Sequence, residues 1–256
     1  MSTYIINGIS DAGTKNPVNQ DASFAGTMNT ANGEAAFVVV CDGMGGLESG
    51  EIASASIIEK MREWFYKKSE LAENWEPDAY EVHKEWDEIV SDCNMSIIEY
   101  SVENGIKCGS TIVCGLLTAE GLILMNVGDS RAYRVSHEVK KLSMDHSVVG
   151  SEIASGLITE EEAKHDKRNN ILTQCIGVVE EVNPYFINDK NSSGLFLFCS
   201  DGFYNRVSND ELFTFFNNGA IENCSLEKTI KEIVSIDRAR GETDDITVIA
   251  LMRLEK

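Results

Sequence analysis

The sequence predicts layered β-sheets with helices packed on the outside. Four short apolar runs have the length of strands and are rich in Val, Ile, Leu or Phe, at residues 36–41, 122–127, 195–199 and 246–252. Because these runs are apolar at nearly every position, we expect both faces of each strand to be covered. Two long helical patterns lie between the first run and the second. Periodicity alone leaves two architectures open, a sandwich and a doubly wound sheet.

Three stretches carry apolar residues at the spacing of one helix face. These residues are Ile57, Met61, Trp64 and Phe65 in the first stretch, Val82, Trp86, Ile89, Cys93, Ile97 and Tyr100 in the second, and Leu226, Ile230, Ile233 and Val234 in the third. Gly241 follows the third stretch and is a candidate stop. Ser208 with Glu211, and Thr159 with Glu162, have the spacing of a capping box, which predicts a helix start at each position.

Length and charge limit the classes of function. The chain has 256 residues, with no internal repeat and no low-complexity linker, so we expect one domain over residues 1–256. Acidic residues outnumber basic residues by 42 to 22, which gives a net charge of −20. Such a surface repels nucleic acid and anionic lipid, so neither is an expected partner, whereas it attracts divalent cations.

Cysteine usage and hydropathy indicate the compartment. The seven cysteines form no C-x-x-C pair, and several lie in apolar runs, so we expect buried free thiols in a reducing compartment. The first residues lack the basic and apolar segments of a signal peptide. No apolar run approaches the roughly 18 residues that a membrane span needs. The sequence therefore predicts a cytoplasmic protein with no membrane segment.

Aspartates stand at one end of all four apolar runs. Asp42, Asp129 and Asp201 follow three of the runs, and Asp244 precedes the fourth. If the fourth strand runs opposite to the others, one antiparallel sheet would gather these carboxylates at a single edge. Each aspartate taken alone is typical of a turn. The pattern therefore leaves open a metal site or a set of unrelated turns.

The residue types favour a hard cation over zinc. Gathered carboxylates need compensating cations to remain ionised together. Oxygen ligands favour magnesium, manganese or calcium. The four histidines, His83, His137, His146 and His165, lack ligand spacing with one another or with cysteine, which argues against a zinc site.

A series of motifs spans nearly the whole chain. In order they are Ser10-Asp11-Ala12-Gly13, Asn19-Gln20-Asp21, Asp42-Gly43-Met44-Gly45-Gly46, Cys108-Gly109-Ser110-Thr111, Val127-Gly128-Asp129-Ser130-Arg131-Ala132-Tyr133, Asp145-His146-Ser147, Asn170-Ile171-Leu172-Thr173, Ser200-Asp201-Gly202 and Asp244-Asp245-Ile246-Thr247-Val248. With these motifs the chain resembles the metal-dependent protein phosphatases of the PPM, or type 2C, family, bacterial branch. The resemblance implies an α+β fold, an αββα sandwich in which two antiparallel sheets pack together between two helix layers. It also implies a variable flap beside the cleft, here at about residues 147–170.

The resemblance implies a centre of two manganese or magnesium ions. Asp42, Asp201 and Asp244 would hold one ion. Asp21, Asp42 and the backbone carbonyl of Gly43 would hold the other, so that Asp42 bridges the two. A hydroxide bridging the ions would attack the phosphorus of phosphoserine or phosphothreonine in a substrate protein. Asp42, Asp201 and Asp244 are therefore the expected catalytic residues, acting through metal-bound water.

Three further expectations follow from comparison with the family pattern. Bacterial relatives often hold a third metal, here expected at Asp129 and Asp201. Many relatives grip the substrate phosphate with an arginine where this chain has Asn16, so Asn16 and the adjacent Lys15 are the expected substrate-binding residues, Lys15 as a point charge. Asp245 replaces the asparagine that is more usual after the last ligand.

The implied partners are phosphoprotein substrates, with a serine/threonine kinase as the functional counterpart. One alternative is a catalytically weak relative that acts by binding a partner; the missing arginine supports it, and the complete set of ligands argues against it. Another is an acidic calcium-binding module, which the absence of an EF-hand pattern disfavours. Around the centre, Arg131 is expected to support the Asp129 loop, and His146 to have a structural role.

Overall fold

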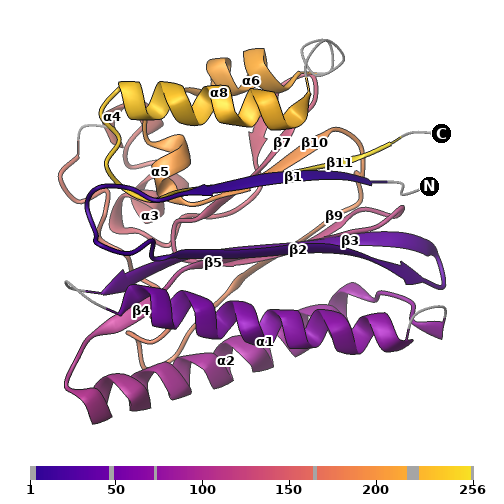
Figure 1. The fold of residues 1–256 in the computed structure, drawn as a ribbon, viewed down its shortest axis with the longest axis horizontal. Helices are drawn as coiled ribbons and strands as arrows, with labels where there is room; N and C mark the ends of the chain where they lie inside the picture. Colours follow the sequence, from indigo (N-terminus) through magenta and orange to yellow (C-terminus); the bar gives the residue numbers. More distant parts are fainter. Residues whose placement is uncertain (1–3, 46–48, 72–73, 164–165, 218–224, 255–256) are drawn as a thin grey trace.

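Two antiparallel sheets pack face to face between two layers of helices (Figure 1). The computed structural model describes residues 4–45, 49–71, 74–163, 166–217 and 225–254. Within these residues, neighbouring strands of both sheets pair antiparallel. The predicted αββα sandwich is therefore confirmed. A doubly wound sheet, which is built from parallel strands, is excluded.

The two sheets divide the strands between them. The six-stranded sheet contains, in spatial order, β2 (Asp21–Thr30), β3 (Gly33–Gly45), β5 (Ile112–Leu117), β6 (Leu122–Val127) and β9 (Tyr185–Asp189), with β4 (Cys108–Ser110) paired to β3. The five-stranded sheet contains, in spatial order, β1 (Tyr4–Asp11), β11 (Ile246–Arg253), β10 (Leu195–Cys199), β7 (Arg131–Val135) and β8 (Val139–Lys141). The four predicted apolar runs lie in β3, β6, β10 and β11, which confirms them as strands.

Helices cover the outer face of each sheet (Figure 1). The six-stranded sheet is covered by α1 (Gly50–Leu71) and α2 (Ala79–Asn104). The five-stranded sheet is covered by α5 (Asp201–Tyr204), α6 (Asn209–Phe216) and α8 (Leu226–Ala239). The predicted flap contains α3 (Val148–Ala154) and α4 (Glu160–Ala163). The three apolar faces predicted from helical spacing belong to α1, α2 and α8.

Strand β3 shows why these strands are apolar on both faces. Phe37 and Val39 belong to the core that β3 forms with α1 and α2. Val38 and Val40 belong to the core between the two sheets, together with Phe196 of β10. All five side chains are fully buried. Because burying a side chain of this size contributes roughly 1.5–3 kcal/mol, the two cores together hold β3 firmly in the sandwich.

The predicted helix ends are confirmed by local hydrogen bonds. At the start of α6, the Ser208 hydroxyl accepts the N–H of Glu211, and the Glu211 carboxylate accepts the N–H of Ser208. Thr159 and Glu162 make the same reciprocal pair at α4. Gly241 follows α8 with a φ of 88°, a conformation that favours glycine.

The predicted buried thiols are confirmed for the six cysteines that the structure describes, which are all free: Cys41, Cys93, Cys108, Cys114, Cys175 and Cys199. Cys224 lies outside the described residues. Across the described ranges, no helix combines the length and the apolarity that crossing a membrane requires.

Asp237 on α8 is a buried carboxyl group, and both of its side-chain oxygens lack a hydrogen-bond partner among the described residues. Burial, followed by the charge of Glu242, raises the pKa of Asp237 from 3.8 to about 7. The folded protein therefore holds this proton at pH values where the unfolded chain has lost it. Stability contributed by this group is complete below pH 3.8 and is lost as the pH rises toward 7.

Asp237→Asn is therefore expected to stabilise the protein at pH 8 by roughly 1–3 kcal/mol, because the amide has no proton to lose. The gain should shrink to nearly zero at pH 4. Urea unfolding across this pH range measures the difference, and Asp92→Asn, an exposed position on α2, is the matched control. Equal stability of wild type and Asp237→Asn at pH 8 would contradict a strained buried carboxylate.

Candidate metal centre

The predicted aspartates meet at one end of the sandwich, where strands of both sheets begin or end. Asp21 at the start of β2 lies directly opposite Asp42 of β3. Asp129 follows β6, Asp201 follows β10, and Asp244 comes shortly before β11. The expectation that one antiparallel sheet gathers them is wrong, because β3 and β6 belong to the six-stranded sheet while β10 and β11 belong to the five-stranded sheet. The carboxylates converge across the interface between the sheets.

The carboxylates are close enough to perturb one another. Burial raises the pKa of Asp42 well above its ordinary value, and the charges of Asp21, Asp201, Asp129 and Asp244 raise it further, in that order. Burial is also the main cause of the raised pKa values of Asp21, Asp129 and Asp201, and neighbouring carboxylates add to each. A cluster of this kind remains ionised at neutral pH only with compensating cations.

Backbone contacts hold Asp42 and Gly43 in place. Thr111 Oγ1 accepts the N–H of Asp42 at 3.0 Å, and the N–H of Thr111 donates to the Asp42 carbonyl at 2.9 Å. The N–H of Gly43 donates to the Gln20 carbonyl at 3.1 Å. A Cβ atom at Gly43 would lie 2.2 Å from the carbonyl oxygen of Gly50, so any side chain here would push α1 away from β3. The close approach therefore requires glycine.

Asp21 and Asp201 are held by residues from the five-stranded side. Ser200 Oγ donates to Asp21 Oδ2 at 2.7 Å and itself accepts the N–H of Thr247 at 3.0 Å. Asn205 Nδ2 donates to Asp201 Oδ2 at 3.3 Å. The other oxygen of Asp201, Oδ1, is buried with no hydrogen-bond partner among the described residues. A buried carboxylate oxygen without a partner is suited to a cation.

The first motif is joined to the last beside this cluster. Lys15 Nζ donates to Asp244 Oδ2 at 2.6 Å. The Asp245 carboxylate accepts the N–H of Gly13 at 2.7 Å with one oxygen and the N–H of Gln20 at 2.8 Å with the other. An asparagine could accept with only one of these atoms, which gives the departure at Asp245 a structural reason: it clamps the loop that carries Lys15.

Lys15 and Asn16 occupy different surroundings. The Lys15 side chain is mostly exposed, and its amino group lies at the carboxylate cluster. Asn16 Nδ2 donates to Gln20 Oε1 at 2.9 Å, within its own loop. Of the two expected substrate-binding residues, the structure brings Lys15 to the cluster and leaves Asn16 bound to its own loop.

The donor set fits hard divalent cations. All the predicted side-chain ligands are carboxylates, one of them with a buried oxygen free to bind, and their mutual repulsion favours bound positive charge. As the side chains lie, no three Asp, Glu, His or Cys groups within the described ranges close around a common point. Lys15 and Ser200 account for part of this, because they engage Asp244 and Asp21 directly. Bound cations would compete with both contacts.

The Asp129 loop is supported by two predicted residues, Arg131 and His146, and by Tyr204, which was not predicted. His146 Nδ1 accepts the N–H of Gly128 at 3.3 Å, and the N–H of His146 donates to the Gly128 carbonyl at 2.9 Å. Tyr204 donates its hydroxyl to the Asp129 carbonyl at 3.0 Å, and the Arg131 guanidinium stacks 3.6 Å from the Tyr204 ring centre. Arg131 and His146 therefore both have supporting contacts here, as expected. Nothing in the sequence near Tyr204 identified its role, which depends on the turn of α5.

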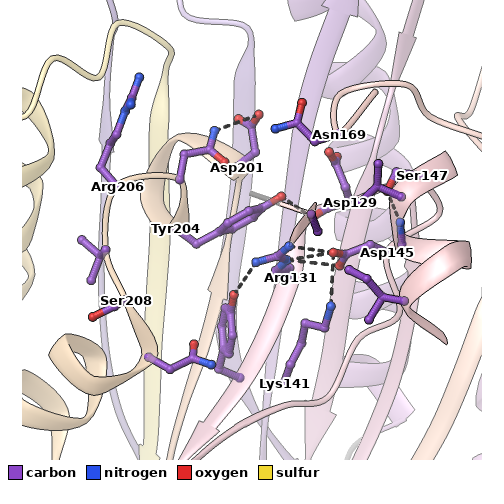
Figure 2. A pocket seen from close by; sticks show the side chains of 18 of the residues that line it. Asp129, Arg131, Lys141, Asp145, Ser147, Asn169, Asp201, Tyr204, Arg206 and Ser208 are labelled. Atoms are coloured by element: carbon purple, nitrogen blue, oxygen red, sulfur yellow. Dashed lines mark hydrogen bonds and ion pairs between the residues drawn. The ribbon is translucent and has the colours of Figure 1, made fainter. Parts of the chain in front are cut away.

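A cavity of about 660 Å³ opens from the cluster (Figure 2). Asp129 and Asp201 line one end of it. The predicted flap, including Ser147 and Asn169, forms one wall, and the segment from Tyr204 to Glu211 forms another. The cavity therefore extends the site from the carboxylates toward α6.

Comparison with known proteins identifies the family. A family model described as protein phosphatase 2C matches residues 12–234. A putative protein phosphatase 2C-type from Streptococcus pyogenes is 30% identical over 243 residues, which cover 93% of each chain. The serine/threonine phosphatase stp of Listeria monocytogenes is 28% identical over 222 residues, 84% of each chain. The crystal structure of the serine/threonine phosphatase Stp1 from Staphylococcus aureus matches with a TM-score of 0.84 and 26% identity, over 100% of this chain and 96% of that one. The predicted resemblance is confirmed, and the chain belongs to the protein phosphatase 2C family of serine/threonine protein phosphatases.

Proposed function

We propose that this chain removes phosphate from phosphoserine and phosphothreonine in proteins by using two manganese or magnesium ions, and that a third ion can bind next to them. The observation that carries the proposal is the convergence of buried carboxylates from both sheets, whose repulsion calls for cations. Membership of the protein phosphatase 2C family, a metal-dependent family, supports it.

The proposed ligands follow the arrangement of the cluster. Asp42, Asp201 and Asp244 would hold one ion, and Asp21, Asp42 and the carbonyl of Gly43 the other. The register of β2 and β3, which places Asp21 opposite Asp42, supports the shared role of Asp42. A third ion would lie at Asp129 and Asp201, which line the same end of the cavity.

The residues of the chain would organise the reaction. What the cations supply when bound is activation of water and compensation of charge on the phosphoryl group. Ser200 orients Asp21, Thr111 fixes the backbone of Asp42, and Asp245 clamps the loop of Lys15. Lys15 would donate to the substrate phosphate once cations have taken over Asp244, because its amino group already lies beside the cluster.

The proposed setting is signalling inside the cell. Phosphoproteins are the substrates that the family implies, and a serine/threonine kinase would be the counterpart. The six buried free thiols support a reducing compartment such as the cytoplasm. The proposed catalytic domain spans residues 1–256, with the segment 147–170 as its flap.

The test is phosphate release from phosphothreonine and phosphoserine peptides by the purified chain with added manganese. We expect steady turnover of both peptides and much slower turnover of the phosphotyrosine peptide of the same sequence. Absence of phosphate release from all three peptides, with a folded protein verified by circular dichroism, would overturn the proposal.

A further inference from the structure

On the floor of the 660 Å³ cavity, two cationic side chains, Arg131 and Lys141, pair with one carboxylate, Asp145 (Figure 2). Arg131 donates to both oxygens of Asp145, at 3.1 and 3.2 Å from Nε and at 2.7 Å from Nη2. Lys141 Nζ donates to Oδ2 of the same Asp145 at 3.2 Å. The Asp145 side chain is only 5% exposed. One carboxylate therefore neutralises only one of the two cations.

Asp145 is ionised in this arrangement. Burial alone would raise the pKa of Asp145, but the charges of Arg131 and then Lys141 outweigh burial and hold the pKa below its ordinary value. The three side chains together leave one positive charge in excess at neutral pH. This excess charge lies in the same cavity as Asp129 and Asp201.

Lys141 is the less constrained of the two cationic side chains, because a single hydrogen bond holds it among the described residues. Arg131 also donates from Nη1 to the Tyr133 hydroxyl at 3.0 Å and stacks on Tyr204, so each of its three side-chain nitrogens already has a partner. An ammonium group has three donors. Among the described residues, Lys141 Nζ uses one of them, on Asp145. Its side chain is 27% exposed and lines the cavity, so it can meet an incoming group.

We propose that Lys141 binds an acidic side chain of the substrate protein, close to the phosphorylated residue. The inference rests on the proposed function, because that function places the phosphate at the ions held in part by Asp201, which lies at the end of this cavity. An acidic side chain would use the spare donors of Lys141 and neutralise the excess charge. Lys141 thereby becomes a specificity-determining residue for substrate sequence.

Two features of the surroundings bear on the choice of an acidic occupant. Glu211, on the α6 side of the cavity, is already paired with Arg240, while Asp210 beside it is exposed to solvent. The net charge of −20 would repel an acidic substrate from a distance. Salt screens this repulsion beyond about 8 Å at physiological ionic strength. The local contact at Lys141 therefore decides which side chain the floor of the cavity accepts.

The test compares phosphothreonine peptides that differ only in one neighbour of the phosphothreonine, which is glutamate, alanine or lysine, placed before or after it in separate peptides. For wild type we expect kcat/KM for a glutamate peptide to exceed that of its alanine counterpart by about fivefold, mainly through a lower KM. Lys141→Ala should remove this preference. Lys141→Glu should turn it toward the lysine peptide.

The matched control is Lys140→Ala. Lys140 is the neighbour of Lys141 on β8, is exposed, and points to the opposite face of the strand, so its loss should leave the preference intact. Equal kcat/KM for the glutamate and alanine peptides in wild type, or a glutamate preference that survives Lys141→Ala, would overturn the inference while the phosphatase activity stands. Failure to hydrolyse any of the peptides would overturn the proposed function itself, and this inference with it.

Discussion

Replacing Asp42 with alanine is expected to abolish phosphate release while the protein remains folded. Asp42 is the one carboxylate proposed to contact both ions, so its loss weakens both sites together. Cation activation of water and charge compensation are worth several kcal/mol of barrier, which corresponds to a decrease in kcat of at least about a thousandfold. Asp201→Asn and Asp244→Asn should have similar effects, because each removes a charged ligand of one ion.

The fold should tolerate Asp42→Ala for an electrostatic reason. Burial and four neighbouring charges all oppose ionisation of Asp42, so removing it relieves repulsion that the remaining carboxylates would otherwise feel. Its backbone contacts to Ser110 and Thr111 involve main-chain atoms of residue 42 and do not depend on the side chain. Steady-state kinetics and thermal unfolding of the purified variant measure the two effects. Near-normal kcat in a folded Asp42→Ala protein would show that the centre lies elsewhere.

Much of the fold could be predicted because its signals are local. The run at 195–199 and the run at 122–127 coincide with β10 and β6, since strands buried on both faces are apolar at every position. The capping box of Ser208 and Glu211 depends on a spacing of three residues, which the sequence displays directly.

The assignment of strands to sheets could not be predicted from the apolar runs. A strand buried on both faces has the same pattern in either sheet of a sandwich, so β3 and β10 gave no sign that they lie in different layers. This is why the aspartates were expected at the edge of one sheet and instead meet between two. The family resemblance supplied the two-sheet fold, which the strand patterns had left open.

The contacts that position the candidate ligands also could not be predicted from the sequence. Ser200 and Asp21 are separated by 179 residues, and Gly13 and Asp245 by 232 residues. No periodicity or local motif connects residues so far apart, and only the folded arrangement shows that Ser200 orients Asp21. Asp245 departs from the family pattern, and only the structure shows that its second oxygen accepts the N–H of Gln20 and so holds the loop of Lys15.

Removing the metal ions is expected to have an effect on turnover as large as that of Asp42→Ala, and to be reversible. Dialysis against EDTA should eliminate phosphate release, and manganese should restore it, because the proposed nucleophile is water activated by the ions. Lys15 is paired with Asp244, and His146 Nδ1 accepts the N–H of Gly128, so both side chains are already engaged.

Manganese binding should also raise the thermal stability of the protein. This measurement separates metal binding from catalysis. A ligand that binds only the folded state at a hundred times its Kd stabilises by about 2.7 kcal/mol, so manganese should raise the midpoint of thermal unfolding. Asp92→Ala, an exposed position on α2 far along the chain from the cluster, should retain the whole shift, whereas Asp42→Ala should lose most of it. Isothermal titration of manganese into each protein reports the binding directly. Turnover that survives EDTA in a protein verified as metal-free would overturn the metal-dependent mechanism, because ions bound by the carboxylate cluster would then have no part in activating water.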